Sequence, residues 1–376
     1  MKTNTLIHVA LIMLALFLAA CAPEVNSGEP GLKDALEGKF YMGAALNEQQ
    51  ILGKDSTSLA LIQSHFNSVV AENCMKMGPI HPEEGAFNFE LADRFIEFAN
   101  DLDMYTVGHC LVWHSQAPDW FFTDEEGNEV SREVLIERMK EHILTVAGRY
   151  KGKVDSWDVV NEAFEDDGSW RETPFYRIIG KDYLEMAFIF ANEADPEAEL
   201  IYNDYSMYHE GRRDAVVELV RSLKEKGIRI DGVGMQAHYG MDFPTLEAFE
   251  KSIVAFAETG VDVHITEMDI SILPSPWSQT GAEISKQADY QEKMNPYADG
   301  LPDSVDLALN QRWVDFFDLF LKHQDKIKRV TTWGISDLHS WKNNWPIRGR
   351  TNYPLLFDRE FNPKPAVEEI IKSAGQ

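Results

Sequence analysis

The sequence predicts an α/β protein in which residues 36–376 form a single domain, a (β/α)8 TIM barrel. Two observations lead to this prediction. Eight short apolar runs rich in β-branched residues alternate with longer segments of helical periodicity. Polar and aromatic residues follow almost every one of these runs, as they do on the functional rim of such a barrel. A doubly wound open sheet is the structural alternative.

The expected strands and helices alternate from residue 40 onward. Strands are predicted at Phe40–Leu46, Asn67–Glu72, Tyr105–Trp113, Val154–Asn161, Glu199–Asn203, Asp231–His238, Val261–Thr266 and Arg329–Trp333. Helices are predicted at Leu91–Leu102, Arg132–Arg149, Tyr183–Ala194, Asp214–Lys226, Leu246–Thr259, Gln311–His323 and Pro365–Ser373. The polar strand ends favour the barrel, because burying so many polar groups at one rim is costly unless they bind something.

The longest predicted connection runs from Ser271 to about Asn310 and contains several prolines. Loops of this size are usually functional or disordered. Because it follows the strand that ends beside Glu267, we expect it to form one wall of a site; a decorative insertion is the alternative. Within that strand, His264 is expected to pack in the core against a helix.

Residues 1–20 are predicted to be a lipoprotein-type signal peptide. A lone Lys2 precedes the apolar run Leu6–Ala20, which is short for a membrane span and ends in small residues. The Leu-Ala-Ala-Cys sequence that ends at Cys21 resembles the lipobox of bacterial lipoproteins, whose cysteine is acylated. Cys21 would then anchor an exported protein to the periplasmic or cell-surface face of a bacterial membrane, with residues 21–35 as a flexible tether. A plain cleaved signal with an incidental cysteine is the alternative.

Composition narrows the class of ligand. The chain has 62 acidic and 35 basic residues and a formal net charge of −27, so a nucleic acid would be repelled over most of its surface. A neutral, hydroxyl-rich ligand fits better. There is no GxGxxG or P-loop for a nucleotide. Cys74 and Cys110 belong to no CxxC or Cys/His cluster, so no cofactor or metal is expected; whether they pair stays open.

Two carboxylates, Glu162 and Glu267, follow nonadjacent predicted strands and would face each other across the mouth of a barrel. Cleavage of a glycosidic bond requires such a pair, one carboxyl to protonate the leaving oxygen and one to attack or to activate water. A lone glutamate after a strand is more often a salt-bridge partner. On the residues alone, catalysis and a structural role therefore both remain open.

The motifs around these glutamates resemble those of family 10 glycoside hydrolases, the xylanase family with a (β/α)8 barrel. The resemblance spans about residues 40 to 370. It is carried, in family order, by Glu72–Lys76, His81–Gly85, Gly108–Gln116, Trp157–Ala163, Asn203–Tyr205, Gly234–His238, Ile265–Ile270, Thr332–Gly334, Ser340–Trp341 and Pro354–Asp358.

The resemblance implies a retaining endo-β-1,4-xylanase that acts on xylan and xylo-oligosaccharides. It implies that Glu162 is the acid/base and Glu267 the nucleophile that forms a covalent glycosyl intermediate. Asn161 would bind the sugar 2-hydroxyl. His238 and Asp269 would hold Glu267 by hydrogen bonds and keep it ionised.

The resemblance also implies a set of substrate-binding residues. The xylose one unit beyond the cleaved residue on the non-reducing side would be held by Glu72, Asn73, Lys76 and Gln116. The walls around the scissile sugar would be His109, Trp113, Gln236, Trp333 and Trp341, with Tyr205 on the leaving-group side. Trp341 and Gln116 would exclude the hydroxymethyl group that distinguishes glucose from xylose.

Three alternatives to this function remain. A β-1,4-glucanase or mixed-specificity glycanase could use the same barrel, because glucose differs from xylose by one hydroxymethyl group. A surface glycan-binding lipoprotein could keep the aromatic residues without catalysis, although both glutamates are present. A metal-dependent hydrolase is disfavoured, because the rim histidines are interleaved with amides and tryptophans.

Lys342 departs from the pattern of family 10 motifs, since many family members have arginine there.

Overall fold

The computed structural model describes residues 30–276 and 285–375. The predicted signal peptide at residues 1–20, Cys21 and the tether up to residue 29 lie outside the described residues. The last part of the expected tether is folded, because α1 spans Leu32–Ala35 and Leu32 is fully buried. The globular domain therefore begins before the predicted boundary at residue 36.

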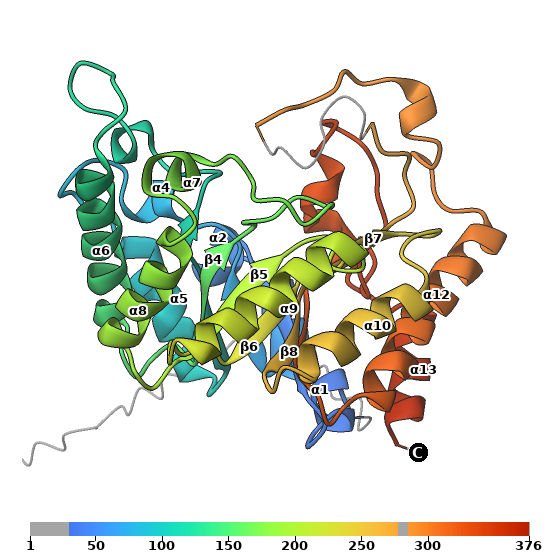
Figure 1. Ribbon diagram of the computed structural model, residues 1–376. Helices are drawn as coiled ribbons and strands as arrows, with labels where there is room; N and C mark the ends of the chain where they lie inside the picture. The colour runs from blue at the N-terminus through green and yellow to red at the C-terminus, as the bar shows by residue number, and fades with distance from the viewer. Residues whose placement is uncertain (1–29, 277–284, 376) are drawn as a thin grey trace, which may run out of the picture.

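Eight parallel strands close into a barrel that is surrounded by helices, which confirms the predicted fold (Figure 1). β1 pairs with both β2 and β9, and β6 pairs with β8, so the ring is complete. The short β7 pairs with the end of β8 and adds to the rim. The strands are β1 (Tyr41–Leu46), β2 (Ser68–Ala71), β3 (Tyr105–Trp113), β4 (Ser156–Asn161), β5 (Glu199–Asp204), β6 (Gly232–Met235), β7 (His238–Gly240), β8 (Asp262–Ser271) and β9 (Ile327–Thr332).

The helices lie between successive strands and cover the outside of the barrel (Figure 1). They are α1 (Leu32–Ala35), α2 (Glu48–Ile51), α3 (Ser56–His65), α4 (Met77–Ile80), α5 (Glu90–Asp101), α6 (Arg132–Arg149), α7 (Pro174–Ile179), α8 (Tyr183–Ala194), α9 (Glu210–Glu225), α10 (Leu246–Ala257), α12 (Asp303–Lys322) and α13 (Pro365–Ala374). Short 3₁₀ turns occur at Asp119–Phe121, Glu292–Met294, Asp337–His339 and Trp341–Asn343. None of the described helices is long and apolar enough to cross a membrane.

Local sequence signals explain where several helices begin. The Ser131 hydroxyl accepts a hydrogen bond from the Val134 amide at the start of α6, and Thr173 caps α7 in the same way. Pro174 occupies the first position of α7, where its missing N–H would be unpaired in any case. α6 then turns one apolar face to the barrel, burying Leu135, Met139, Ile143, Val146 and Ala147.

The predicted boundaries hold for β3, α6 and α8, which match residue for residue. The predicted strand Asp231–His238 is instead divided into β6 and β7, because Ala237 adopts a left-handed backbone with φ of 67°. α12 begins at Asp303 rather than Gln311, because exposed acidic residues and Leu307 obscure its helical periodicity. α3 was not predicted, since its first turn, Ser-Thr-Ser, is typical of a loop.

Polar side chains fill the barrel interior beneath the rim. Arg329 Nε donates to His264 Nδ1 at 3.1 Å, and the guanidinium lies 3.8 Å from Asp158. Asp158 accepts a hydrogen bond from His109 Nδ1 at 2.8 Å. His264 therefore bonds to a neighbouring strand inside the barrel, and the prediction that it packs against a helix is wrong. Periodicity could not decide this, because both faces of a barrel strand are buried.

A buried ion pair secures the segment between β9 and α13. Lys364 Nζ lies 2.7 Å from Asp337 Oδ2, with side chains 7% and 0% exposed. Asp337 Oδ1 also accepts from the Leu355 amide at 2.8 Å. Burial raises the pKa of Asp337 to about 6, although Lys364 opposes the shift.

Lys364→Met is expected to lower the free energy of unfolding by about 3 kcal/mol or more at about pH 7, because it leaves a buried carboxylate without its partner. The folded pKa of Asp337 is raised above the unfolded value near 3.8, so ionising this group opposes folding. That cost is absent below about pH 4 and complete above the folded pKa. The loss in free energy of unfolding caused by Lys364→Met should therefore become smaller on acidification from about pH 7 to about pH 4.

Urea denaturation at both pH values measures this deficit. Lys372→Met, which removes an exposed lysine of α13, is the matched control and should cost little. A deficit for Lys364→Met that is equal at both pH values, or no larger than that of the control, would contradict the role given to the ion pair.

Candidate active site

A large cavity opens at the C-terminal ends of the barrel strands. Its volume is about 850 Å³, which is typical of a ligand site. The predicted catalytic and substrate-binding residues that line it are Glu72, Asn73, Lys76, His109, Trp113, Gln116, Asn161, Glu162, Tyr205, Gln236, His238, Glu267, Trp333 and Trp341. Asp269 lies behind this wall, bonded to His238.

Glu267, on β8, is 5% exposed and is bonded at both carboxylate oxygens. Asn203 Nδ2 donates to Oε1 at 2.8 Å, and His238 Nε2 lies 3.2 Å from Oε2. Burial by itself would raise the pKa of Glu267, but the hydrogen bond from His238 and the charges of His109 and His238 lower it below its usual value. Glu267 is therefore held in its ionised form.

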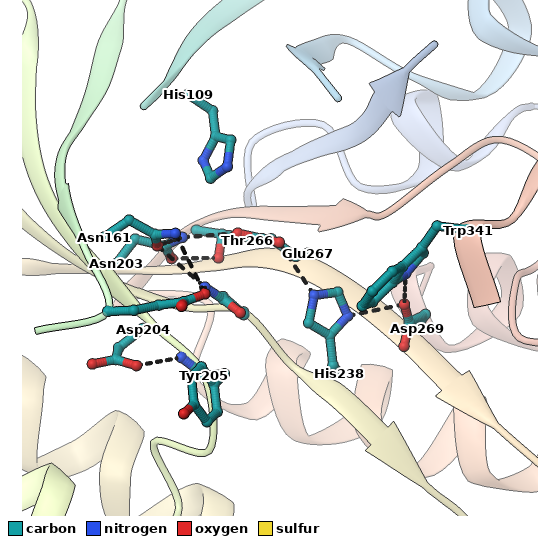
Figure 2. A network of polar contacts seen from close by, with 12 residues as sticks. His109, Asn161, Asn203, Asp204, Tyr205, His238, Thr266, Glu267, Asp269 and Trp341 are labelled. Carbon is teal, nitrogen blue, oxygen red and sulfur yellow. Dashed lines mark hydrogen bonds and ion pairs between the residues drawn. The ribbon is translucent and has the colours of Figure 1, made fainter. Parts of the chain in front are cut away.

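His238 connects Glu267 to Asp269, as Figure 2 shows. Its Nδ1 lies 2.9 Å from Asp269 Oδ2, and that oxygen also accepts from Trp341 Nε1 at 2.8 Å. Burial lowers the pKa of His238, but Asp269 and Glu267 together raise it above its usual value. A carboxylate can only accept, so protonated His238 donates to both acids and fixes their positions.

Glu162 stands at the end of β4, where the backbone is left-handed with φ of 61°. Such a conformation is uncommon for a residue with a side chain and is found often at functional sites. Trp113 Nε1 donates to Oε2 at 2.9 Å, and Gln236 Nε2 donates to Oε1 at 3.0 Å. Neutral donors thus hold Glu162, whereas an ionisable histidine holds Glu267.

Three amides, those of Asn161, Asn203 and Gln236, link the two glutamates. Figure 2 shows Asn161 and Asn203 beside Glu267. Asn203 Nδ2 donates to Asn161 Oδ1 at 3.0 Å as well as to Glu267. Gln236 Nε2 donates to the same Asn161 oxygen at 3.2 Å as well as to Glu162. The side chain of Asn161 therefore lies between the two carboxylates.

A polar cluster around Lys76 forms another part of the wall. Lys76 Nζ donates to Asn73 Oδ1 and to Gln116 Oε1, each at 3.0 Å. The hydrogen bonds of Lys76 thus go to two amides, while Glu72 acts on it through charge. Burial lowers the pKa of Lys76 and raises that of Glu72, because both groups have lost hydrogen bonds to water. The hydroxyl groups of a ligand could replace these hydrogen bonds.

Tyr205 follows β5 and is held by two arginines. Its hydroxyl accepts from Arg171 at 2.5 Å, and its carbonyl accepts from Arg212 at 2.6 Å. Arg171 also donates to the Glu162 carbonyl at 3.1 Å, so one guanidinium connects the aromatic wall to the glutamate.

Sequence reasoning gave no role to three residues that the structure places in these networks, Asn203, Thr266 and Arg171. Thr266 Oγ1 donates to Asn203 Oδ1 at 2.7 Å and so orients the amide that holds Glu267 (Figure 2). Asn203 and Thr266 could have been suspected from their places at or near strand ends. Arg171 lies in a loop and carries no such signal.

The described part of the long connection lines the same cavity through Ser271–Ser275 and Gln287. That part confirms the expected wall, although the connection ends at Asp303, where α12 begins. Cys74 and Cys110 are buried free thiols. Within residues 30–276 and 285–375, no group of three or more His, Cys, Asp or Glu side chains is placed to hold a metal ion.

Comparisons with known proteins point to one family. Residues 31–373 match the model of glycosyl hydrolase family 10. Endo-1,4-beta-xylanase A of Xylanibacter ruminicola is 53% identical over 93% of this chain and 94% of its own. An endo-1,4-beta-xylanase of Geobacillus stearothermophilus is 41% identical over 92% of this chain and 99% of its own.

Solved structures agree with the sequence relatives. A family 10 endoxylanase from a sugarcane soil metagenome superposes with a TM-score of 0.87 at 46% identity, covering 91% of this chain and 99% of that one. Xylanase XynB of Paenibacillus barcinonensis, in complex with a conduramine derivative, has a TM-score of 0.82 at 37% identity over 92% and 99%. With the family match covering nearly all of the described residues, the chain belongs to glycosyl hydrolase family 10.

Proposed function

We propose that the chain is an endo-β-1,4-xylanase that hydrolyses xylan with retention of configuration at the anomeric carbon. One observation carries the proposal: two buried glutamates face one cavity, Glu267 held ionised beside His238 and Glu162 held by Trp113 and Gln236. Retaining hydrolysis needs two carboxyl groups at one site, one that attacks the anomeric carbon and one that donates a proton to the leaving oxygen. The family, and the relatives named as endo-1,4-beta-xylanases, support xylan as the substrate.

In the first step, Glu267 attacks the anomeric carbon while Glu162 gives its proton to the glycosidic oxygen. The bond to the leaving chain breaks, and the xylosyl unit becomes an ester of Glu267. Asn161, between the two carboxylates, is placed to take the 2-hydroxyl. Tyr205 offers its ring to the departing chain.

In the second step, Glu162 has lost its proton and acts as a base on a water molecule. The charge of Glu267 is absent in the ester, so an ionised Glu162 is no longer opposed by a second carboxylate. The water attacks the anomeric carbon from the side that the leaving chain vacated and gives its proton to Glu162, while the bond between that carbon and Glu267 breaks. Two inversions restore the β configuration.

Preference for xylose over glucose is assigned to the wall that contains Trp341. Its indole is held by Asp269 at 2.8 Å and is stacked on Trp345 with ring centroids 4.9 Å apart. A side chain fixed in this way resists displacement, so a hydroxymethyl group pressed against it would clash. Gln116 is likewise fixed by Lys76. Xylo-oligosaccharides should therefore turn over much faster than cello-oligosaccharides of the same length.

Proton NMR of the first products formed from a soluble xylo-oligosaccharide tests this proposal, with the matching cello-oligosaccharide as control. The β-anomer is expected first, followed by slow mutarotation. An initial α-anomer would remove Glu267 from the role of nucleophile. Binding of xylan without cleavage would favour a glycan-binding protein, and equal turnover of both oligosaccharides would favour a mixed-specificity glycanase.

We also propose that the chain is exported and anchored to a bacterial membrane by acylation of Cys21. The apolar run Leu6–Ala20 and the lipobox-like residues before Cys21 support this proposal. Residues 21–29 would then connect the lipid to the described domain, in which α1 spans Leu32–Ala35.

Metabolic labelling with a fatty-acid analogue, followed by detergent phase partition, tests the anchor. The full chain should be labelled and enter the detergent phase, whereas Cys21→Ser should be unlabelled. Equal labelling of both would contradict acylation at Cys21. If the protein with Cys21 intact is exported and loses its signal peptide but carries no label, a plain cleaved signal is indicated instead.

A further inference from the structure

Lys342 lies beside the catalytic network and has no part in the hydrolytic mechanism above. Its side chain is 12% exposed, and its ammonium group lies 3.7 Å from Asp269 Oδ1. Asp269 Oδ2 accepts from both His238 and Trp341, whereas Oδ1 has no hydrogen bond among the described residues. The ammonium group therefore faces the free oxygen of the carboxylate that orients His238.

The aromatic residues beside Lys342 fix the position of this charge. Lys342 Nζ lies 4.3 Å from the centre of the Trp341 ring and 5.7 Å from that of Trp345. The two indoles are stacked, with an angle of 14° between their planes. A cation held over an indole face is attracted by its quadrupole, so the same ammonium group contacts the aromatic wall and Asp269 together.

The groups that face this cluster come from several elements. The side chains of His238 and His109 interact electrostatically with Glu267. Those of Asp269, Glu267 and Arg350 interact electrostatically with Lys342. Lys76 faces Glu162 and Glu267 from the other part of the cavity. Among these described groups, His238 bonds to Oδ2 of Asp269, and Lys342 is the cation that faces Oδ1.

We propose that Lys342 is a positioning residue: its ammonium group holds Asp269 and, through Asp269 and His238, keeps the nucleophile Glu267 ionised in mildly acid solution. Figure 2 shows Asp269, His238 and Glu267 in line, with Trp341 hydrogen-bonded to Asp269. The proposal rests on the nucleophile role given to Glu267 above.

The sign of the effect follows from charge. Glu267, His238 and Asp269 interact strongly, so their protons titrate as a group. Removing one positive charge from the group makes every uptake of a proton easier. The acidic limb of activity, where the nucleophile becomes protonated, should therefore move to higher pH when Lys342 loses its charge.

The test is the pH profile of kcat/KM for Lys342→Met on an aryl β-xylobioside with a good leaving group. Such a leaving group needs no proton, so the acidic limb reports the nucleophile and its neighbours in the free enzyme. The limb should move up by about half a pH unit or more. Lys342→Arg should restore the wild-type limb, because it keeps the charge. KM should change little at the plateau, since methionine keeps the packing against Trp341.

Lys372→Met, an identical substitution on the outer surface of α13, is the control and should leave the limb unchanged. Lys342→Gln repeats the test with a second neutral residue if Lys342→Met does not fold. A folded neutral variant with a limb within about 0.2 units of wild type would overturn the proposal. So would a shift that Lys342→Arg shares. These outcomes differ from failure of the proposed function, which would appear as an initial α-anomer or as no hydrolysis by wild type.

Discussion

Glu267→Ala is expected to lower kcat/KM on xylo-oligosaccharides by about 10⁵-fold or more, because the reaction loses the group that forms its covalent intermediate. The fold should survive, since a carboxylate whose partners are neighbouring polar side chains is removed and no core contact is lost. Initial rates and thermal unfolding measured on the same samples separate loss of chemistry from loss of structure.

An external nucleophile gives this variant a distinctive product. With an activated aryl β-xyloside and azide, Glu267→Ala should form the α-xylosyl azide, because azide enters from the face that the carboxylate occupied. Proton NMR identifies the anomer. Glu258→Ala, which removes an exposed glutamate directly after α10, should behave as wild type. Formation of the β-azide, or substantial activity without azide, would assign the nucleophile to another residue.

The effect of Glu162→Ala on the rate is expected to depend on the leaving group of the substrate. Hydrolysis of xylo-oligosaccharides should fall by about 10³-fold or more, because the sugar leaving group must be protonated as the bond breaks. An activated aryl xyloside needs no such proton, so it should still form the ester with Glu267. Breakdown of the ester then lacks its base, and a burst of the phenol followed by slow turnover should appear in stopped-flow absorbance.

Azide should accelerate this second step and give the β-xylosyl azide, which is the opposite anomer from that expected of Glu267→Ala. The two variants are therefore matched controls for each other. If Glu162→Ala lost activity equally on activated and unactivated substrates, Glu162 would be a structural residue rather than the acid/base.

The difference between the two glutamates comes from their surroundings. Glu267 meets a histidine that a second carboxylate, Asp269, favours in its charged form, and this lowers the pKa of Glu267. Glu162 meets an indole and an amide, neither of which carries charge. The two glutamates thus differ in the side chains that donate to them, because Glu267 has an ionisable donor and Glu162 has an indole and an amide.

Much of the fold could be predicted from the sequence because its determinants are local. The alternation of short β-branched runs with helical periodicity predicted the barrel, and capped helices such as α6 were located to the residue. The division of Asp231–His238 was missed because one backbone angle at Ala237 ends the strand. The periodic pattern of apolar and polar residues does not indicate a single backbone angle.

The order of strands, the polar residues at their ends and the motifs around Glu162 and Glu267 could all be read from the sequence. Which side chains meet is visible only in the folded chain: Asn203 with Glu267, His264 with Arg329, and Lys342 with Asp269. The partners in each pair are more than 60 residues apart in the chain, and closure of the barrel brings them within 4 Å. The physical reason is that a strand's sequence specifies which residues lie near its end, whereas curvature and register of the whole sheet specify what lies across from them.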